Sequence, residues 1–213
     1  MAQKIAKPSH VIKGLYALTP DSLDTDELLG RVRLACAGGI SVLQYRNKVA
    51  DAALRLVQAR ALRAVTLEFG VILIVNDDAQ LAASVNADGV HIGATDGSVP
   101  EARALLGKDK LIGVSCYNQL QLARDAIRAE ADYVAFGAFY SSTVKPNAAV
   151  ATIELLRQAH AELPVPIVAI GGINETNGAD LLAAGADALA VISAVFDAPD
   201  IQVAVKNLNR LFK

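Results

Sequence analysis

The stretch VILIVNDDAQLAASVNADGVHIG, residues 71–93, contains the pattern that decides the fold. An apolar run, Val71–Val75, is followed by three polar residues, by an amphipathic stretch at Ala79–Val85 and by a second apolar run at Gly89–Ile92. Short apolar runs rich in β-branched residues are typical of strands buried on both faces of a parallel sheet. The stretch therefore predicts a strand, a helix and a second strand parallel to the first.

The same alternation continues in both directions along the chain. Further strands are predicted at Leu15–Leu18, Ile40–Tyr45, Leu111–Ser115, Tyr133–Phe136, Pro166–Ile170 and Ala188–Ile192. Further helices are predicted at Asp26–Ala37, Asp51–Phe69, Pro100–Leu106, Gln119–Ala129, Thr152–Glu162, Thr176–Ala183 and Ile201–Leu211. Eight strands alternating with eight helices in 213 residues predict an α/β fold, a (β/α)₈ TIM barrel, with residues 1–213 as one domain. An open flavodoxin-like sheet uses only about five or six such units.

Local signals refine this prediction at the helix ends. Small or acidic residues precede four strands, in Ala37-Gly38-Gly39-Ile40, Ala87-Asp88-Gly89-Val90, Ala131-Asp132-Tyr133-Val134 and Ala186-Asp187-Ala188-Leu189. They recur about every second unit, which predicts a barrel built from four similar quarters. Thr25, Asn118 and Asn174 are predicted to cap the helices that follow them.

Composition excludes several classes of partner. With 20 basic and 22 acidic residues the net charge is −2, so we predict no nucleic-acid or membrane partner and expect any anion to be held by local groups. The two cysteines, Cys36 and Cys116, form no zinc motif or disulfide framework. Residues 1–10 lack the apolar segment of a signal peptide, and no run reaches transmembrane length, so we expect a cytoplasmic protein. A homo-oligomer remains open.

In a TIM barrel the chemistry is carried by the residues that follow the strands, and the second strand ends in cationic residues. Because side chains alternate along a strand, Gln44, Arg46 and Lys48 are expected to share one face with Ile40 and Val42. If that face points inward, an amide, a guanidinium and an ammonium converge at the barrel mouth, where they can hold phosphate oxygens. The alternative is a solvated loop with two ordinary surface charges.

Carboxylates follow the third and fourth strands. Asp77 and Asp78 come from one loop and Asp96 from the next, and neighbouring loops can bring such groups to one Mg²⁺ ion. The alternative is that Asp77 or Asp78 only caps the helix beginning near Ala79, and we expect one of them to do so. His91 is interpreted as a satisfied core residue and is left out of the catalytic set.

The remaining strand ends carry hydroxyl groups and glycines. Ser115 has no nearby base in the sequence, so we interpret it as a hydrogen-bond donor and not as a nucleophile, and we expect Cys116 to be inert. The loop with Ser142, Thr143 and Lys145 is a candidate anion clamp, or simply a polar loop.

The ends of the seventh and eighth strands indicate a second anion site. Gly171-Gly172 follows the seventh strand, and Ile192-Ser193 ends the eighth. Backbone N–H groups in such turns, together with the start of the following helix, can bind phosphate, although both segments are also compatible with plain tight turns. Two anion sites at one barrel mouth favour two phosphorylated small-molecule substrates.

Taken in order, these segments resemble the thiamine-phosphate synthase family. The resemblance rests on Gln44-Tyr45-Arg46-Asn47-Lys48, Ile74-Val75-Asn76-Asp77-Asp78, Asp88-Gly89-Val90-His91-Ile92-Gly93, Gly113-Val114-Ser115, Ile170-Gly171-Gly172-Ile173 and Val191-Ile192-Ser193. It implies a transferase of thiamine biosynthesis. That enzyme joins 4-amino-2-methyl-5-hydroxymethylpyrimidine diphosphate to 4-methyl-5-(2-phosphoethyl)thiazole, giving thiamine monophosphate and pyrophosphate.

The resemblance also implies roles for individual residues. Those for the pyrimidine diphosphate are Gln44, Arg46, Lys48, Asn76, Ser115 and Lys145, with Arg46, Ser115 and Lys145 as the catalytic set. Tyr45 and Asn47 are expected among the substrate-binding residues. Asp77 and Asp96 would hold the Mg²⁺ cofactor. Gly172, Ile192 and Ser193 would bind the thiazole phosphate, and Ser142, Thr143 and Val144 would line the thiazole side. The chain departs from the family pattern at Val144, where a threonine is usual, and at Ala94, where glutamine is common.

The reaction implied is a dissociative substitution in which the cations and Mg²⁺ stabilise the departing pyrophosphate. Two rivals stay open. One is a thiazole tautomerase on the same barrel, which has no diphosphate to hold. The other is an inactive barrel that binds a phosphorylated ligand as a sensor.

Overall fold

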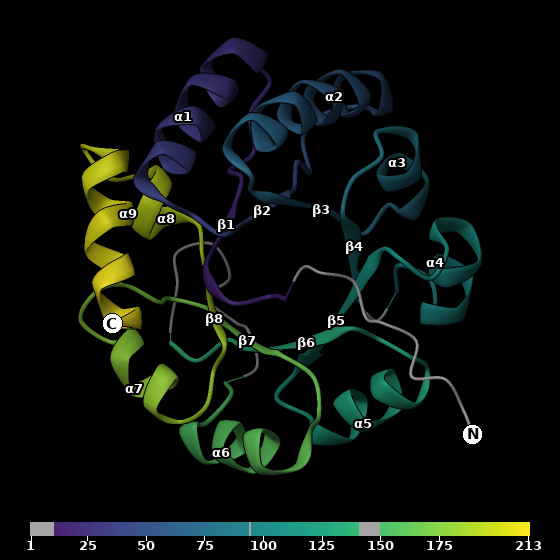
Figure 1. The fold of residues 1–213 in the computed structure, drawn as a ribbon, viewed down its shortest axis with the longest axis vertical. Helices are drawn as coiled ribbons and strands as arrows, with labels where there is room; N and C mark the ends of the chain where they lie inside the picture. Colours follow the sequence, from purple (N-terminus) through teal and green to yellow (C-terminus); the bar gives the residue numbers. More distant parts are fainter. Residues whose placement is uncertain (1–10, 94, 141–149) are drawn as a thin grey trace.

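The chain forms a closed barrel of eight parallel strands surrounded by helices (Figure 1). The computed structural model describes residues 11–93, 95–140 and 150–213. The strands are β1 (Gly14–Leu18), β2 (Val42–Tyr45), β3 (Ile72–Asn76), β4 (Gly89–Ile92), β5 (Leu111–Tyr117), β6 (Tyr133–Phe136), β7 (Ile167–Ile170) and β8 (Ala188–Val191). Strands adjacent in sequence pair with one another, and β8 closes the barrel onto β1. The predicted (β/α)₈ barrel is confirmed.

Helices follow the strands and form an outer layer. They are α1 (Thr25–Gly38), α2 (Ala52–Phe69), α3 (Ala79–Ser84), α4 (Val99–Leu106), α5 (Leu120–Arg128), α6 (Ile153–Glu162), α7 (Gly178–Ala183), α8 (Ser193–Phe196) and α9 (Ile201–Asn209), which ends in the 3₁₀ turn Arg210–Phe212. The short helix α8 was not predicted. No helix in the described part of the chain has the length and apolar character needed to cross a membrane.

The three predicted helix caps were wrong. The cap of α1 is Asp24, whose carboxylate accepts the N–H of Glu27, and α5 begins after Gln119 without a side-chain cap. Asn174 lies before a turn, where its Oδ1 accepts the N–H of Thr176, and α7 begins four residues later at Gly178. Asn and Asp side chains satisfy turns as readily as helix ends, so residue type alone does not distinguish the two.

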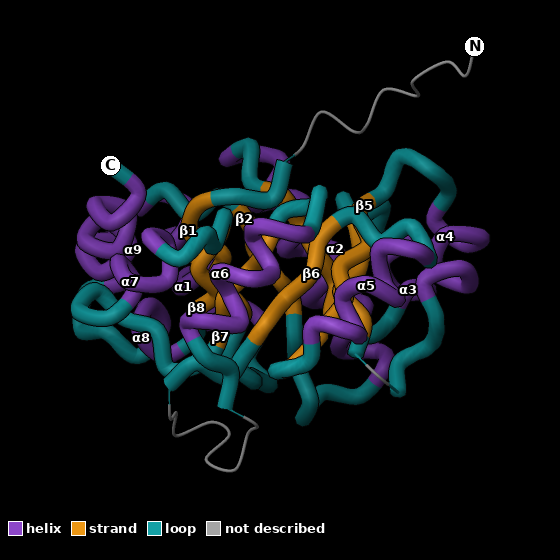
Figure 2. The backbone as a smooth tube through the Cα atoms, turned by 90° about the horizontal axis from the view of Figure 1, so that it is seen from below, coloured by secondary structure: helices purple, strands orange, loops and turns teal. Residues whose placement is uncertain are grey.

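Helices surround the strands of the barrel (Figure 2), and two apolar layers lie on the two faces of the sheet. The inner layer fills the barrel and includes Val42, Ile74, Leu111 and Val168, whereas the larger outer layer lies between strands and helices. Ile40 belongs to the outer layer, which corrects the prediction that it shares the inward face with Val42. Its N–H bonds to Ala35 at the end of α1, so it precedes the strand and does not follow strand alternation.

The predicted quarter repeat has a structural cause at the entry to the even-numbered strands. In Asp88, Asp132 and Asp187 the backbone N–H bonds to a carbonyl of the preceding odd-numbered strand. The strand residues concerned are Leu73, Ile112 and Ile167. Each of them also donates its own backbone N–H to the carboxylate of the same aspartate at 2.8 Å, so its N–H and its carbonyl are both paired. In the first quarter Ser41 takes this position, with its N–H bonded to Leu15.

Replacing Asp88 with Ala should lower the free energy of unfolding by about 2–4 kcal/mol, because it removes a partly buried ion pair and leaves a backbone N–H unpaired. Arg63 donates to both carboxylate oxygens, at 2.7 and 3.1 Å. Urea unfolding provides the measurement. Ser41→Ala is the matched control and should change the value by less than about 0.5 kcal/mol. Equal losses in the two variants would contradict a role for the carboxylate.

Candidate active site

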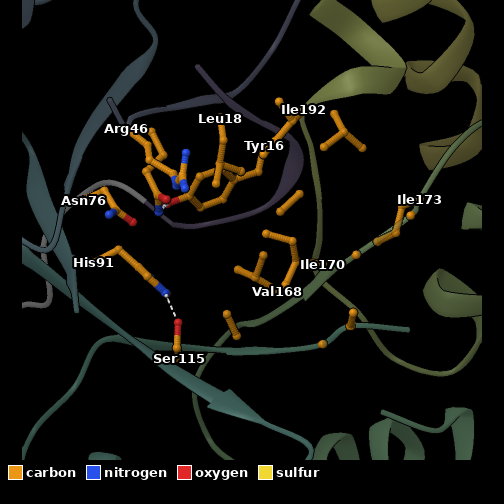
Figure 3. A pocket seen from close by; sticks show the side chains of 18 of the residues that line it. Tyr16, Leu18, Arg46, Asn76, His91, Ser115, Val168, Ile170, Ile173 and Ile192 are labelled. Carbon is orange, nitrogen blue, oxygen red and sulfur yellow. Dashed lines mark hydrogen bonds between the residues drawn. The ribbon is translucent and has the colours of Figure 1, made fainter. Parts of the chain in front are cut away.

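A cavity of about 370 Å³ opens where the strands end, and residues from all eight strands or the loops directly after them line it. Its two halves differ in chemistry. Gln44, Arg46, Asn76, His91 and Ser115 supply polar groups from β2 to β5. Across the cavity lie mostly apolar side chains of β7 and β8 and their loops, among them Val168, Ile170 and Ile192 (Figure 3). The cavity can therefore hold one polar, charged partner beside one less polar partner.

A continuous chain of hydrogen bonds crosses the polar side of the barrel interior. Gln44 Nε2 donates to Tyr16 Oη at 2.8 Å, and Tyr16 Oη lies 3.0 Å from Tyr133 Oη. Tyr133 Oη lies 3.1 Å from His91 Nδ1. His91 Nε2 lies 2.9 Å from Ser115 Oγ, as Figure 3 shows. Burial lowers the pKa of His91 to about 4 and raises the pKa of both tyrosines. These groups are therefore uncharged at neutral pH.

Gly113 makes room for the Tyr133 ring of this hydrogen-bond chain. A Cβ atom added at Gly113 on β5 would lie 2.0 Å from Cζ of the Tyr133 ring. The ring therefore lies against bare backbone, and its hydroxyl reaches the centre of the barrel. The Gly-Val-Ser segment at the end of β5 thus contributes both the space for Tyr133 and the hydroxyl of Ser115.

Arg46 is anchored in the cavity wall by the loop after β1. Its Nη1 donates to the two carboxylate oxygens of Asp21 at 3.1 and 3.3 Å. Its backbone N–H donates to Thr19 Oγ1, and Thr19 Oγ1 donates to the Arg46 carbonyl. Within residues 11–93, 95–140 and 150–213, Arg46 is the only residue with a permanent charge that lines the cavity. Its position suits an anionic group bound at the barrel mouth.

Lys48 lies outside this cavity and forms an ion pair with Asp77 at the rim. It lines a small adjoining pocket that also contains Asn76 and Asp77. The predicted convergence of three groups is therefore divided: Gln44 and Arg46 line the cavity itself, and Lys48 lies at its edge.

Tyr45 and Asn47 do not line the main cavity; together with Lys48 they line the small adjoining pocket. Tyr45 is buried in the outer layer and donates to Gln58 Oε1 on α2 at 2.8 Å. Asn47 Nδ2 donates to the same oxygen at 2.9 Å and to the Ser22 carbonyl. Side chains alternate across a strand, so the neighbours of Gln44 and Arg46 face the helices. They hold α2 and the loop after β1 and do not line the main cavity.

Asp77 and Asp96 line the same open groove at the rim of the barrel. Asp77 adopts a positive φ of 64°, and Asp96 Oδ2 accepts the N–H of Gly93 at 3.0 Å. A Cβ added at Gly93 would lie 2.6 Å from that oxygen, so glycine makes space for the carboxylate. Asp78 lies on the same groove and caps α3 by accepting the N–H of Leu81, as predicted for one of the two aspartates.

These carboxylates fit Mg²⁺ better than a metal held by protein ligands alone. No cluster of three or more His, Cys, Asp or Glu side chains suited to a metal occurs among the described residues. Two oxygen donors on one groove match an ion that keeps several water ligands and takes phosphate oxygens from a substrate. The donor set is therefore compatible with the predicted cofactor.

The loops after β7 and β8 form the opposite wall. Gly171 and Gly172 have positive φ values of 107° and 62°, conformations that glycine adopts at no steric cost. Asn177 Nδ2 donates to the Gly172 carbonyl and fixes this turn. Ile192 and Ser193 line the same wall at the start of α8. Backbone N–H groups at such turns can bind phosphate.

Ser142, Thr143, Val144 and Lys145 lie outside the described residues, as does Ala94. Cys116 is described, and burial raises the pKa of its thiol to about 12, in agreement with the expected lack of reactivity.

Sequence reasoning missed four groups of this site. Tyr16 and Tyr133 occur inside apolar runs and give no polar signal, and Asp21 lies between a predicted strand and a predicted helix without a motif of its own. His91 is satisfied in hydrogen bonding, as interpreted, but it also lines the cavity beside Ser115. A usable signal was present at Tyr16, because it shares the inward face of β1 with Leu18.

The fold and the site define a TIM-barrel enzyme of the class that binds phosphorylated small molecules at the ends of its strands. A family model described as thiamine monophosphate synthase matches residues 15–195. The chain belongs to this family.

Similar proteins agree with the family model. A thiamine-phosphate synthase from Thiobacillus denitrificans is 54% identical over 199 residues, covering 93% of this chain and 94% of that protein. One from Nitrosospira multiformis is 48% identical over 208 residues, covering 98% of this chain and 89% of the relative. Among solved structures, thiamine phosphate pyrophosphorylase from Pyrococcus furiosus is 33% identical with a TM-score of 0.83, and the match covers 93% of this chain and 94% of that one.

Proposed function

We propose that this chain condenses 4-amino-2-methyl-5-hydroxymethylpyrimidine diphosphate with 4-methyl-5-(2-phosphoethyl)thiazole to give thiamine monophosphate and pyrophosphate. One observation carries the proposal beyond family membership. A single cavity combines a wall holding Arg46, Asn76 and Ser115 with an opposite wall of apolar side chains and glycine turns. Such a cavity can bring a diphosphate and a thiazole phosphate together in one orientation.

The polar wall is assigned to the diphosphate. Arg46 would bind phosphate oxygens through its planar fork, with Asn76 and Ser115 as further hydrogen-bonding partners. Lys48 would reach the same group from the rim, and Lys145 would complete the catalytic set. The turns at Gly172 and at Ile192-Ser193 would bind the thiazole phosphate through backbone N–H groups, with the segment at residues 142–144 on the thiazole side.

Asp77 and Asp96 would hold Mg²⁺, which supplies charge stabilisation to a diphosphate when it is bound. Lys48, now paired with Asp77, would then be free to contact the diphosphate. The aspartates contribute negative charge and oxygen donors, and the cations contribute positive charge to the same rim.

The chain's own residues act by positioning and electrostatics. The C–O bond to the diphosphate breaks first, its electron pair leaves with the pyrophosphate, and Arg46 and Ser115 stabilise the charge that develops there. The aminopyrimidine ring delocalises the cation left behind, and the thiazole nitrogen captures it. The apolar half of the cavity keeps water from that cation. No covalent nucleophile is needed, which agrees with the unreactive Cys116.

An assay with both substrates tests the proposal. We expect thiamine monophosphate and pyrophosphate to form in equal amounts with Mg²⁺ present, and turnover to fall to background in a metal chelator. Chromatography of the product and a coupled pyrophosphate assay provide two independent measurements. Absence of product with both substrates and Mg²⁺ would exclude the proposed reaction.

The same experiment separates the rivals. A tautomerase would isomerise its thiazole substrate without Mg²⁺ or diphosphate. A sensor would bind the phosphorylated ligand, and show a higher melting temperature with it, without forming product. Arg46, Lys48, Asp77 and Asp96 together favour the synthase, because a tautomerase has no pyrophosphate to hold.

A further inference from the structure

The hydrogen-bond chain inside the barrel contains three residues with no role in the function proposed above. Tyr16, Tyr133 and His91 are buried and connect Gln44 on β2 to Ser115 on β5. Polar groups at the centre of a barrel are costly unless each is paired, and here each has a partner. The chain ends at Ser115, whose hydroxyl faces the cavity.

Counting the protons shows which group donates in each hydrogen bond of this chain. Gln44 Nε2 donates to Tyr16 Oη, so the one hydroxyl proton of Tyr16 is directed to Tyr133 Oη at 3.0 Å. The proton of Tyr133 is then directed to His91 Nδ1. A neutral imidazole that accepts at Nδ1 carries its proton on Nε2 and donates it to Ser115 Oγ.

The opposite direction leaves one proton unpaired at Tyr16. If Ser115 donated to His91, the imidazole would donate to Tyr133, and Tyr133 to Tyr16. Tyr16 Oη would then accept from both Gln44 and Tyr133, and its own proton would have no acceptor within the hydrogen-bond chain. With Nε2 of Gln44 placed toward Tyr16, only the direction that ends at Ser115 pairs every proton of the hydrogen-bond chain.

We propose that Tyr16, Tyr133 and His91 are positioning residues that fix the hydrogen bond at Ser115, so that the serine presents its proton to the bound substrate. This inference rests on the proposed function in one respect, because the expected acceptor is an anionic diphosphate oxygen. An anion accepts hydrogen bonds and cannot donate them. A serine that had already donated its proton to His91 would present lone pairs to that anion. A donor oriented before binding needs no reorganisation during the reaction.

The protonated nitrogen of His91 can be measured without any substrate. The protein has three histidines, so labelling with ¹⁵N-histidine gives a simple NMR spectrum. The signals of the two ring nitrogens show which tautomer is present. The spectrum of His91→Gln assigns the signals by their loss. We expect the Nε2–H tautomer of His91 to account for about nine-tenths of the population or more. A predominant Nδ1–H tautomer would overturn the inference, whether or not the protein makes thiamine monophosphate.

Two variants test the hydrogen-bond chain itself. Tyr133→Phe keeps the ring against Gly113 and removes the donor to His91 Nδ1, so the Nδ1–H population should rise by severalfold. Tyr16→Phe should shift it in the same direction and serves if the first variant does not fold. Tyr140→Phe is the matched control, because its hydroxyl bonds to the Asn177 carbonyl outside this chain, and it should leave the tautomer unchanged. An unchanged tautomer in both chain variants would overturn the inference.

A double-mutant cycle tests whether the hydrogen-bond chain contributes to turnover. Tyr133→Phe should lower kcat about tenfold with a smaller change in KM, and it should cause no further loss in a Ser115→Ala background. A purely structural defect would reduce kcat equally in both backgrounds, and that result would overturn the link to Ser115. The tautomer measurement needs no turnover, so failure of the proposed reaction and failure of this inference can be told apart.

Discussion

The Arg46→Ala variant should have a kcat/KM roughly 100- to 1000-fold below that of the unmodified chain, while its fold is retained. Arg46 is the one permanently charged residue on the described cavity wall, and Asp21 and Thr19 hold it before substrate binds. Removing it deletes a preorganised positive charge at the place where the leaving pyrophosphate gains negative charge. Steady-state kinetics with both substrates, following thiamine monophosphate, give the measurement.

Two further variants make this result specific. Arg46→Lys keeps the charge but loses the fork, so its loss should be about tenfold. Arg33→Ala removes an arginine on the outer surface of α1 that pairs with Glu68, and it should stay within about twofold of the unmodified chain. If Arg46→Ala kept kcat/KM within threefold, Arg46 would have no part in holding the diphosphate.

The Asp77→Asn variant should need roughly 10- to 100-fold more Mg²⁺ for half-maximal turnover, and its kcat should fall as well. Asn is the suitable replacement, because Asp77 has a φ of 64° and Asn tolerates this left-handed conformation. The substitution therefore changes the charge and leaves the backbone in place. A titration of turnover against Mg²⁺ at saturating substrate concentrations measures the effect.

Asp78→Asn is the matched control for the metal site. It removes the same charge from the same groove one residue away, and Asn caps α3 about as well as Asp does. Its Mg²⁺ requirement should match that of the unmodified chain. An equal increase in both variants would indicate that the groove attracts Mg²⁺ by overall charge and that Asp77 is not a ligand.

The strand ends show how far sequence reasoning reaches in this fold. Alternation along β2 correctly placed Gln44 and Arg46 on the inward face, because that rule depends only on neighbouring residues. The same rule failed at Ile40, which lies before the strand begins. Tyr45 and Asn47 entered the predicted site through family resemblance, although alternation assigns them to the outward face.

The buried tyrosines show where sequence reasoning stops. Tyr16 and Tyr133 are 117 positions apart in the chain, and each lies in an apolar run that reads as ordinary core. Their hydroxyls meet because barrel closure directs the inward side chains of β1 and β6 into the same interior. The partners of Asp88 and Asp132 on α2 and α4 were likewise absent from the local repeat that identified those aspartates.

The sequence by itself determined the alternation of eight strands with helices, the quarter repeat, and the polar residues at the strand ends. These features follow from short-range rules: side-chain period, β-branched runs and the chemistry of turns. Only the tertiary structure decided which of those ends share a cavity, which carboxylates line one groove, and which side chains join Gln44 to Ser115. Barrel closure brings together residues far apart in sequence, and the resulting pairing of buried polar groups depends on distances that no local pattern contains.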